Sequence, residues 1–210
     1  MKILLMVNIT KLQNSYLRIK DFINKTPILI SEKLNQDFNA SFYLKNEVDQ
    51  VTGSFKIRGA LSALSKLKEN NINGVVAYSS GNHAQGVSKA AQIFGMHAII
   101  VMPEDAPQNK IDKTLANGAE VVLYKRHIES REEIALKIAD EKQYPLVKPF
   151  DNEDIIAGQG SFGLEACEYF IQNDITPNIV LSCTSGGGLV AGTSICLLYT
   201  SPSPRDTRRS

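Results

Sequence analysis

Short apolar runs and longer amphipathic segments alternate along the middle of the chain. The run HAIIVM at residues 97–102 is almost continuously apolar, and residues 119–124 carry Val121, Val122 and Leu123. Runs of this kind are typical of parallel strands that are buried on both faces. Between them, apolar residues recur at the three- and four-residue spacing of a helix. The pattern predicts, in chain order, strand 75–78, helix 83–94, strand 97–102, helix 108–117, strand 119–124 and helix 130–143.

This alternation indicates a doubly wound α/β domain, because a strand that returns parallel to its predecessor needs a crossover connection, usually a helix. The flanking regions are less regular. Their patterns predict helices at 11–24, 55–70 and 160–173, and strands at 28–30, 40–46 and 179–183. The 210 residues are enough for one large or two small domains.

Composition and charge narrow the possible partners. A net charge of +1 and 43% hydrophobic residues give no surplus that points to nucleic acid or to a membrane surface. The apolar stretch at residues 3–7 is too short to span a bilayer, and no small-residue cleavage site follows it. The three cysteines, at 167, 183 and 196, lack pairing or metal-ligand spacing, which favours a reducing compartment. We therefore expect a cytoplasmic protein with no metal site, no nucleic-acid partner and no membrane contact.

Lys56 is the first candidate for chemistry. It follows the Gly53–Ser54 turn at the start of the predicted helix 55–70, and its neighbours Phe55 and Ile57 are apolar. Desolvation lowers the pKa of an amine and makes it nucleophilic towards a carbonyl carbon, as a Schiff-base lysine requires. The alternative is a solvated lysine at a helix start.

The second candidate is the turn YSSGNHAQG at residues 78–86. It lies between a predicted strand and a predicted helix, so that backbone N–H groups gather at a helix N-terminus, which attracts a carboxylate or another anion. The alternative is an ordinary helix cap formed by Ser80 or Asn82.

The third candidate is the run SGGGL at residues 185–189, which follows the predicted strand 179–183. Three consecutive glycines let the backbone approach a ligand and turn its N–H groups towards a phosphate. No Walker lysine follows, and the spacing is not that of a dinucleotide fingerprint. A flexible turn is the alternative.

An amine and a phosphate-binding turn are both required by pyridoxal 5′-phosphate. The motifs TGSFKIRGA (52–60), SSGNHAQG (79–86), AGQGS (157–161) and SGGGL (185–189) resemble, in this order, those of the threonine/serine dehydratase and serine racemase family. The resemblance runs from about residue 26 to 192. It implies fold type II of the pyridoxal-phosphate enzymes, the α/β fold of the tryptophan synthase β-subunit, with parallel sheets in a large and a small domain and with the large domain incomplete here.

The resemblance assigns a role to each motif residue. Lys56 would form the Schiff base with the cofactor, Phe55 would pack near its ring, and Asn82 would bond the ring hydroxyl. The cofactor phosphate would lie against Ser185, Gly186, Gly187, Gly188 and Leu189. The substrate carboxylate would lie against Ser79, Ser80, Gly81, Asn82 and His83. Ser80 also matches the second acid/base of the racemases of this family.

The domains implied by the resemblance are residues 1–73 and 149–195 for the large domain and 74–148 for the small one. The implied reaction is β-elimination from L-threonine or L-serine to a 2-oxo acid and ammonia, and the implied parent protein is a homo-oligomer. Serine racemisation and 3-hydroxyaspartate dehydration stay open, the latter with Arg58 or another cation meeting the second carboxylate. An inactive ligand-binding fragment also stays open.

The last segment differs in character from the rest. Residues 196–206 (CLLYTSPSPRD) are similar to the translated sequence of a transposase-type sequencing adapter, and Pro202 and Pro204 follow where a helix should continue. We therefore expect residues 196–210 to be a non-native tail and the helix after the glycines to be cut short. The alternative is a natural disordered tail.

Overall fold

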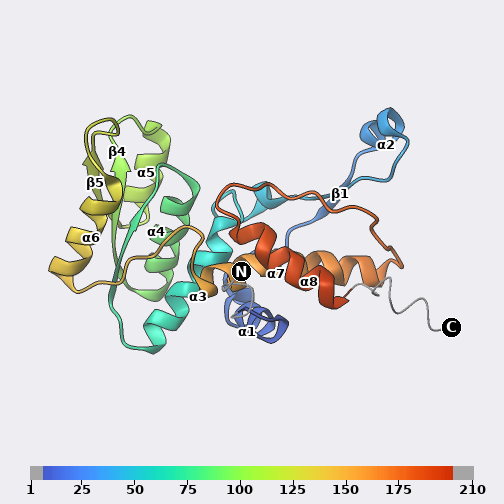
Figure 1. Cartoon of the computed structure of the whole chain (residues 1–210), viewed down its shortest axis with the longest axis horizontal. Coiled ribbons are helices and arrows are strands. Elements are labelled where there is room, and N and C mark those ends of the chain that lie inside the picture. Colours follow the sequence, from blue (N-terminus) through green and yellow to red (C-terminus); the bar gives the residue numbers. More distant parts are fainter. Residues whose placement is uncertain (1–6, 201–210) are drawn as a thin grey trace.

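The computed structural model describes residues 7–200 as an elongated molecule with two different ends. A sheet with its helices forms one end, and an antiparallel pair of strands projects at the other (Figure 1). Four helices lie between them: α1 (Ile9–Ile19), α3 (Lys56–Glu69), α7 (Glu153–Gln172) and α8 (Gly188–Thr200). Within this range no helix is both long and apolar enough to cross a membrane.

The sheet contains three parallel strands in the order β3 (Gly74–Tyr78), β4 (His97–Pro103) and β5 (Glu120–Tyr124). A bridge between Val76 and Leu146 adds the returning chain beside β3. Side chains alternate between the two faces of a strand, and both faces are covered. Ala77 and Ile100 pack towards α4, whereas Val76 and Ile99 pack towards α6.

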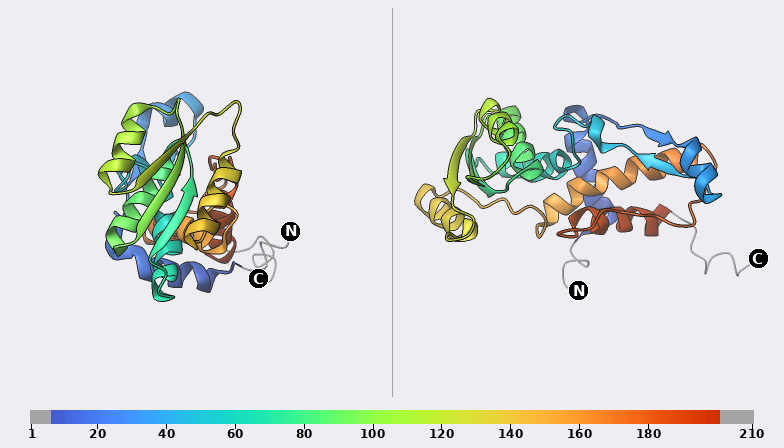
Figure 2. Two further views of the ribbon diagram at one scale, coloured as in Figure 1. Left: turned by 90° about the vertical axis from the view of Figure 1, so that its left-hand side faces the viewer. Right: turned by 90° about the horizontal axis from the view of Figure 1, so that it is seen from above.

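The connecting helices confirm the α/β pattern that the sequence predicts. They are α4 (Asn82–Phe94), α5 (Gln108–Ala116) and α6 (Arg131–Lys142), and α6 lies on the opposite side of the sheet from α4 and α5 (Figure 2, left). Their ends carry recognisable caps. The Ser130 side chain accepts a bond from the N–H of Glu133 at the start of α6, and Gly95 ends α4 in the left-handed region with φ +60°.

The central helices approach one another closely through small residues. A Cβ atom on Gly158 of α7 would lie 2.3 Å from the carbonyl oxygen of Arg58 in α3, and one on Gly192 of α8 would lie 2.7 Å from the Cα of Gly160. Helix α7 begins seven residues before the predicted start at 160, because the Asn152 side chain accepts bonds from the N–H groups of Asp154 and Ile155.

The projecting pair consists of β1 (Ile28–Ile30) and β2 (Tyr43–Lys45), which are antiparallel. Between them lies α2 (Glu32–Phe38), a helix that the hydrophobic pattern did not predict. The short helix η3 (Glu47–Asp49) follows β2 at this end, whereas η2 (Lys20–Phe22) follows α1, with the Phe22 ring 5.5 Å from that of Phe94 in α4. Figure 2 (right) shows the projecting pair from above.

The predicted strand at 179–183 is wrong. The segment has no ladder partner among residues 7–200, and the side chains of Ile179 and Leu181 are 78% and 85% exposed. A run of β-type residues forms a strand only when a neighbour takes up its backbone hydrogen bonds.

The helix after the glycines is longer than predicted, since α8 runs from Gly188 to Thr200. Residues 196–200 of the predicted tail lie within it, with Cys196 buried against the α7 side. The rest of the predicted tail, from 201 to 210, lies outside the described residues.

Candidate functional site

Lys56 is the first residue of α3, and its amine is held in place. Nζ donates a hydrogen bond of 2.8 Å to the carbonyl oxygen of Pro149, and it lies 5.2 Å from the centre of the Phe55 ring. Burial lowers the pKa of this amine, since the charged form loses solvation. The side chain therefore combines a fixed position with an increased population of the neutral, nucleophilic form.

The glycine turn lies next to the same segment. A Cβ atom on Gly186 would lie 2.0 Å from the ring of Phe150, the residue after Pro149, and one on Gly188 would lie 2.5 Å from Oε1 of Gln159. Gly187 has φ +85°, a conformation that L side chains rarely adopt. Residues 149 and 150 thus lie next to both Lys56 and the glycine turn, and positions 186 and 188 leave no room for a side chain.

Helix α8 begins at Gly188, directly after this turn. The first N–H groups of a helix have no intrahelical acceptor, and the helix dipole adds positive potential there. Leu189 is buried in the first turn, whereas Ser185 is exposed just before it. The arrangement suits an anion at the N-terminus of α8.

The turn before α4 lies close to the start of α3. A Cβ atom on Gly86 would lie 3.1 Å from the carbonyl carbon of Lys56, so the first turns of the two helices are in contact. The Ser79 hydroxyl accepts a bond of 3.2 Å from the N–H of Gly81, which shapes the turn, and Ser80 is half-buried. The structure therefore brings the candidate carboxylate turn, Lys56 and the glycine turn to one region.

His83 is fully enclosed on the second residue of α4. Its Nε2 lies 3.0 Å from the carbonyl oxygen of Val147; a carbonyl only accepts, so Nε2 must carry the proton. Nδ1 is then an acceptor, and it has no partner within the described residues. Burial lowers the His83 pKa to about 4, and the positive charge of Lys56 acts in the same direction. A neutral ring with a free lone pair cannot donate to a carboxylate, which leaves the backbone N–H of this residue for that contact.

Asn82, the first residue of α4, is exposed. Its Oδ1 accepts a hydrogen bond of 3.1 Å from Nζ of Lys110 in α5. Sequence patterns did not predict a role for Lys110, because it lies 28 positions from Asn82 and no local motif contains both residues.

Pro149, Phe150 and Gln159 were also missed as parts of the site. Gln159 belongs to the AGQGS motif, which by itself predicts no role for this side chain. In the structure both of its amide atoms are buried without a partner within the described part of the chain. An unpaired buried amide beside the glycine turn is a ready polar contact for a ligand.

Arg58 is not available to a substrate. Its side chain is completely buried and donates to Glu47 (2.7 and 2.8 Å) and to Glu165 (2.8 and 2.9 Å). Burial would lower the pKa of the guanidinium, but its bonds to the two carboxylates raise it. The suggestion that Arg58 meets a second substrate carboxylate is therefore wrong, since both carboxylate partners are internal.

Lys45 completes a buried group of four charges, which we call the ion quartet: Lys45, Glu47, Arg58 and Glu165. Nζ of Lys45 lies 2.6 Å from Oε2 of Glu165. Two positive and two negative groups leave the quartet neutral. It joins the start of α3 to β2, η3 and α7, and so it fixes the helix on which Lys56 stands.

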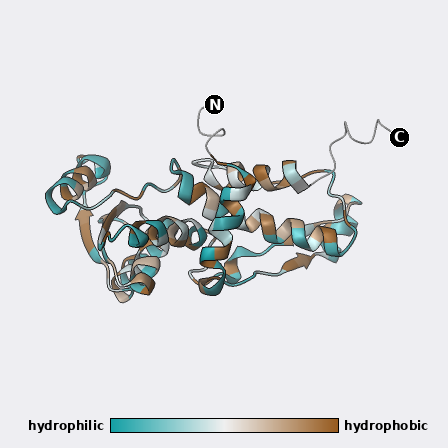
Figure 3. Cartoon of the chain, turned by 90° about the horizontal axis from the view of Figure 1, so that it is seen from below, coloured by the Kyte–Doolittle hydropathy of each residue, from teal (hydrophilic) through white to brown (hydrophobic). Residues whose placement is uncertain are grey.

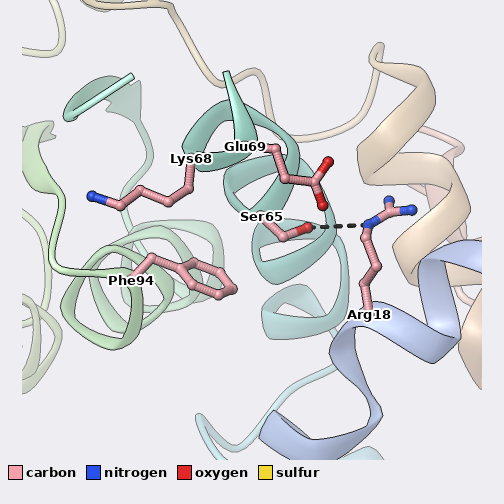
Figure 4. Close-up of a pocket in the computed structure, with 5 residues that line it drawn as sticks. All are labelled: Arg18, Ser65, Lys68, Glu69 and Phe94. Carbon is pink, nitrogen blue, oxygen red and sulfur yellow. Dashed lines mark hydrogen bonds between the residues drawn. The ribbon is translucent and has the colours of Figure 1, made fainter. Parts of the chain in front are cut away.

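A separate open pocket of about 360 Å³ lies between α1, α3 and α4 (Figure 4). Its lining consists of Arg18, Ser65, Lys68, Glu69 and Phe94. Three of these residues are in the last turns of α3, at the opposite end from Lys56. None of the predicted site residues lines it.

Comparison with known proteins gives a family match over most of the chain. The family model described as pyridoxal-phosphate dependent enzyme matches residues 19–206. The L-threo-3-hydroxyaspartate ammonia-lyase of Saccharomyces cerevisiae is 42% identical over 186 residues, 88% of this chain and 56% of that protein. The serine racemase of Schizosaccharomyces pombe is 39% identical over 187 residues, again 88% and 56%.

A third relative and two solved structures agree. The L-threonine ammonia-lyase of Thermotoga maritima is 40% identical over 199 residues, 94% of this chain and 48% of that protein. The T.th. threonine deaminase superposes with a TM-score of 0.86 at 42% identity, covering 93% of this chain and 62% of that one. A pyridoxal 5′-phosphate-dependent aspartate racemase gives 0.87 at 34% identity, covering 95% and 60%. The chain thus spans 48% to 62% of the length of these relatives.

Proposed function

The chain belongs to the family of pyridoxal-phosphate dependent enzymes, and on this premise we propose that its protein catalyses β-elimination from L-threonine or L-serine. The products are a 2-oxo acid and ammonia: 2-oxobutanoate from threonine and pyruvate from serine. The family and its cofactor are shared by lyases and racemases alike, so the reaction and the substrate are the proposed part.

One observation carries the proposal. The amine of Lys56 bonds the carbonyl of Pro149, and the neighbouring Phe150 packs on Gly186, so a nucleophilic nitrogen and a glycine turn suited to an anion contact consecutive residues of one short segment. A phosphorylated aldehyde needs both groups at once. This juxtaposition of residues that are far apart in the chain supports the proposal more than any single motif.

The residues present fit the cofactor. The cradle at Gly186 and Gly188 leaves no room for a Cβ atom, as is common where backbone approaches a phosphate, and α8 adds the positive end of its dipole. Lys56 would hold the cofactor through its amine. When bound, pyridoxal phosphate supplies an electron sink for the negative charge that develops at the substrate Cα.

The chain's own residues then have defined tasks. The N-terminus of α4 would bind the substrate carboxylate through backbone N–H groups and fix the direction of the Cα–H bond. The Lys56 amine, desolvated and therefore more often neutral, would accept the Cα proton. The Ser80 hydroxyl lies in the same turn as the carboxylate contacts, and in a racemase it would return a proton to Cα from the other face. β-Elimination requires a proton on the hydroxyl that leaves Cβ instead, so that it departs as water.

The relatives name two further candidates. A 42% identical relative is an ammonia-lyase of L-threo-3-hydroxyaspartate, and a 39% identical one is a serine racemase. Arg58 gives no support to the dicarboxylic substrate, since the ion quartet occupies it. Ser80 does not separate a racemase from a dehydratase, because the resemblance gives both this serine.

Three more properties belong to the proposal. We propose that residues 74–148 form a small domain set into a large one made of residues 1–73 and 149–195. We also propose a cytoplasmic location and a homo-oligomeric assembly. The parallel sheet and its helices between residues 74 and 142 support the first point.

The deciding experiment uses the protein encoded by the intact gene. It should show the visible absorption band of lysine-bound pyridoxal phosphate, and Lys56→Ala should lose it. Lys68→Ala, which removes a lysine near the other end of the same helix, should keep the band. With threonine, serine and threo-3-hydroxyaspartate as substrates, release of oxo acid identifies the lyase, while formation of D-serine without oxo acid would replace it with the racemase. An absorption band without formation of oxo acid or D-serine would indicate a protein that binds the cofactor and catalyses neither reaction.

A further inference from the structure

Lys110 and Asn82 form a contact between two helices of the sheet unit. Lys110 lies in the first turn of α5 and Asn82 is the first residue of α4, and Nζ is 3.1 Å from Oδ1. At the other end of α5, Nδ2 of Asn117 donates a bond of 2.9 Å to the hydroxyl of Ser88 in the middle of α4. Both ends of α5 are therefore bonded to α4, and the position of Lys110 relative to α4 is defined.

The contact decides which way the Asn82 amide faces. A lysine amine in its charged form only donates, so it must meet the oxygen end of the amide and not the nitrogen end. Turning the amide round would set two donors against each other. Nδ2 of Asn82 has no partner within the part of the chain that the structure describes, so both of its N–H groups remain for a ligand that accepts.

On the premise of the proposed function, we propose that Lys110 is a positioning residue for the cofactor. It holds Oδ1 of Asn82 and thereby presents Nδ2 to the ring oxygen of pyridoxal phosphate. That oxygen accepts hydrogen bonds, and an amide that turned freely would also present its own oxygen, which repels an acceptor. The resemblance assigns Asn82 to the ring hydroxyl; the role of Lys110 follows from the geometry alone.

The test compares two lysines of the same helix. Lys113 lies three residues after Lys110, is exposed, and has no ion pair or side-chain hydrogen bond within the described residues. The affinity of pyridoxal 5′-phosphate for the cofactor-free protein should be measured by absorbance titration for Lys110→Met, Lys113→Met and the unsubstituted protein. We expect affinity to fall about tenfold in Lys110→Met, as is typical for the loss of a charge-assisted bond, and to stay unchanged in Lys113→Met.

Two further variants separate positioning from general support. Lys110→Arg keeps a donor and should restore most of the affinity. Asn82→Ala should weaken binding, and the double variant Asn82→Ala with Lys110→Met should be no weaker than Asn82→Ala alone, because Lys110 acts through that amide. The melting temperature of the cofactor-free Lys110→Met protein should equal that of Lys113→Met.

The outcomes distinguish the two proposals. Equal cofactor affinities of Lys110→Met and Lys113→Met, or additive losses in the double variant, would overturn the role of Lys110 and leave the proposed function standing. Absence of cofactor binding by the unsubstituted protein would overturn both.

Discussion

Apolar residues are buried in the sheet unit at one end of the molecule and are often exposed at the other end. In the sheet unit, β4 is buried from Ala98 to Pro103 because helices cover both faces. In the projecting pair and in segment 176–184, apolar side chains such as Ile30, Leu44 and Leu181 are exposed. Strand residues at both ends have the same brown colour in Figure 3. An apolar segment can therefore be buried only where other parts of the chain pack against it.

The first prediction removes a buried apolar group from the sheet. Ile100→Asp places a carboxylate where both faces are covered, and it should lower the free energy of unfolding by at least about 4 kcal/mol. Leu123→Asp, in β5 and 53% exposed, should cost less than about 1 kcal/mol. Chemical denaturation followed by circular dichroism measures both. Equal losses of unfolding free energy in the two variants would mean that water reaches position 100.

The second prediction concerns the ion quartet, which joins the site to the projecting end. Arg58→Met leaves two buried carboxylates with one cation and should cost about 3–5 kcal/mol of unfolding free energy. Lys33→Met removes the exposed pair with Asp37 and should cost no more than about 0.5 kcal/mol. Denaturant titration of both variants gives the two values. A small effect of Arg58→Met would indicate that this end of the molecule is already loosely packed.

The third prediction is a pH dependence that arises in the sheet unit. The His83 pKa is about 4 in the folded protein and 6.5 in the unfolded chain, so the unfolded chain binds the extra proton first. The contribution of His83 to the free energy of unfolding is therefore fully present above pH 6.5 and is lost as the pH falls towards 4. The difference between these two pKa values corresponds to about 3 kcal/mol of unfolding free energy.

His83→Gln provides the control, since it removes the titrating group and keeps a donor for Val147. Its free energy of unfolding should vary less between pH 7 and pH 4 than that of the unsubstituted protein. Identical slopes for the two proteins would assign the pH dependence to other groups.

The smallest predicted effect lies in the exposed segment. Leu181→Lys should change the unfolding free energy by no more than about 0.5 kcal/mol, because the side chain is 85% exposed. It should nevertheless reduce light scattering by the 210-residue chain, since exposed apolar runs associate. A large loss of stability would mean that Leu181 is buried in solution, for example against a second copy.

Sequence patterns predicted the sheet unit well because its contacts are local in the chain. Each strand from β3 to β5 meets the next across one helix, so periodicity and topology carry the same information. The predictions failed where long-range partners decide the outcome. Residues 179–183 have strand composition but no neighbour within the described residues, and the start of α7 depends on the cap at Asn152.

In the candidate site, too, local features were predicted and long-range contacts were not. Lys56 and the turns at 79–83 and 185–189 stand out locally, each by its own composition. The connection of Lys56 to Pro149 spans 93 positions in the chain, and the pairing of Arg58 with Glu165 spans 107. No local spacing contains such information.

Residues 145–149 lead from the sheet unit back to the central helices and bond to both. At one end the N–H groups of Val76 and Val147 bond across to Pro145 and Val76, and at the other the carbonyl of Pro149 holds the Lys56 amine. The carbonyl of Val147, two residues earlier, holds His83. Any tilt of the sheet against the central helices would pull on the nitrogen of Lys56, so the orientation of one half of the molecule and the reach of its reactive group vary together.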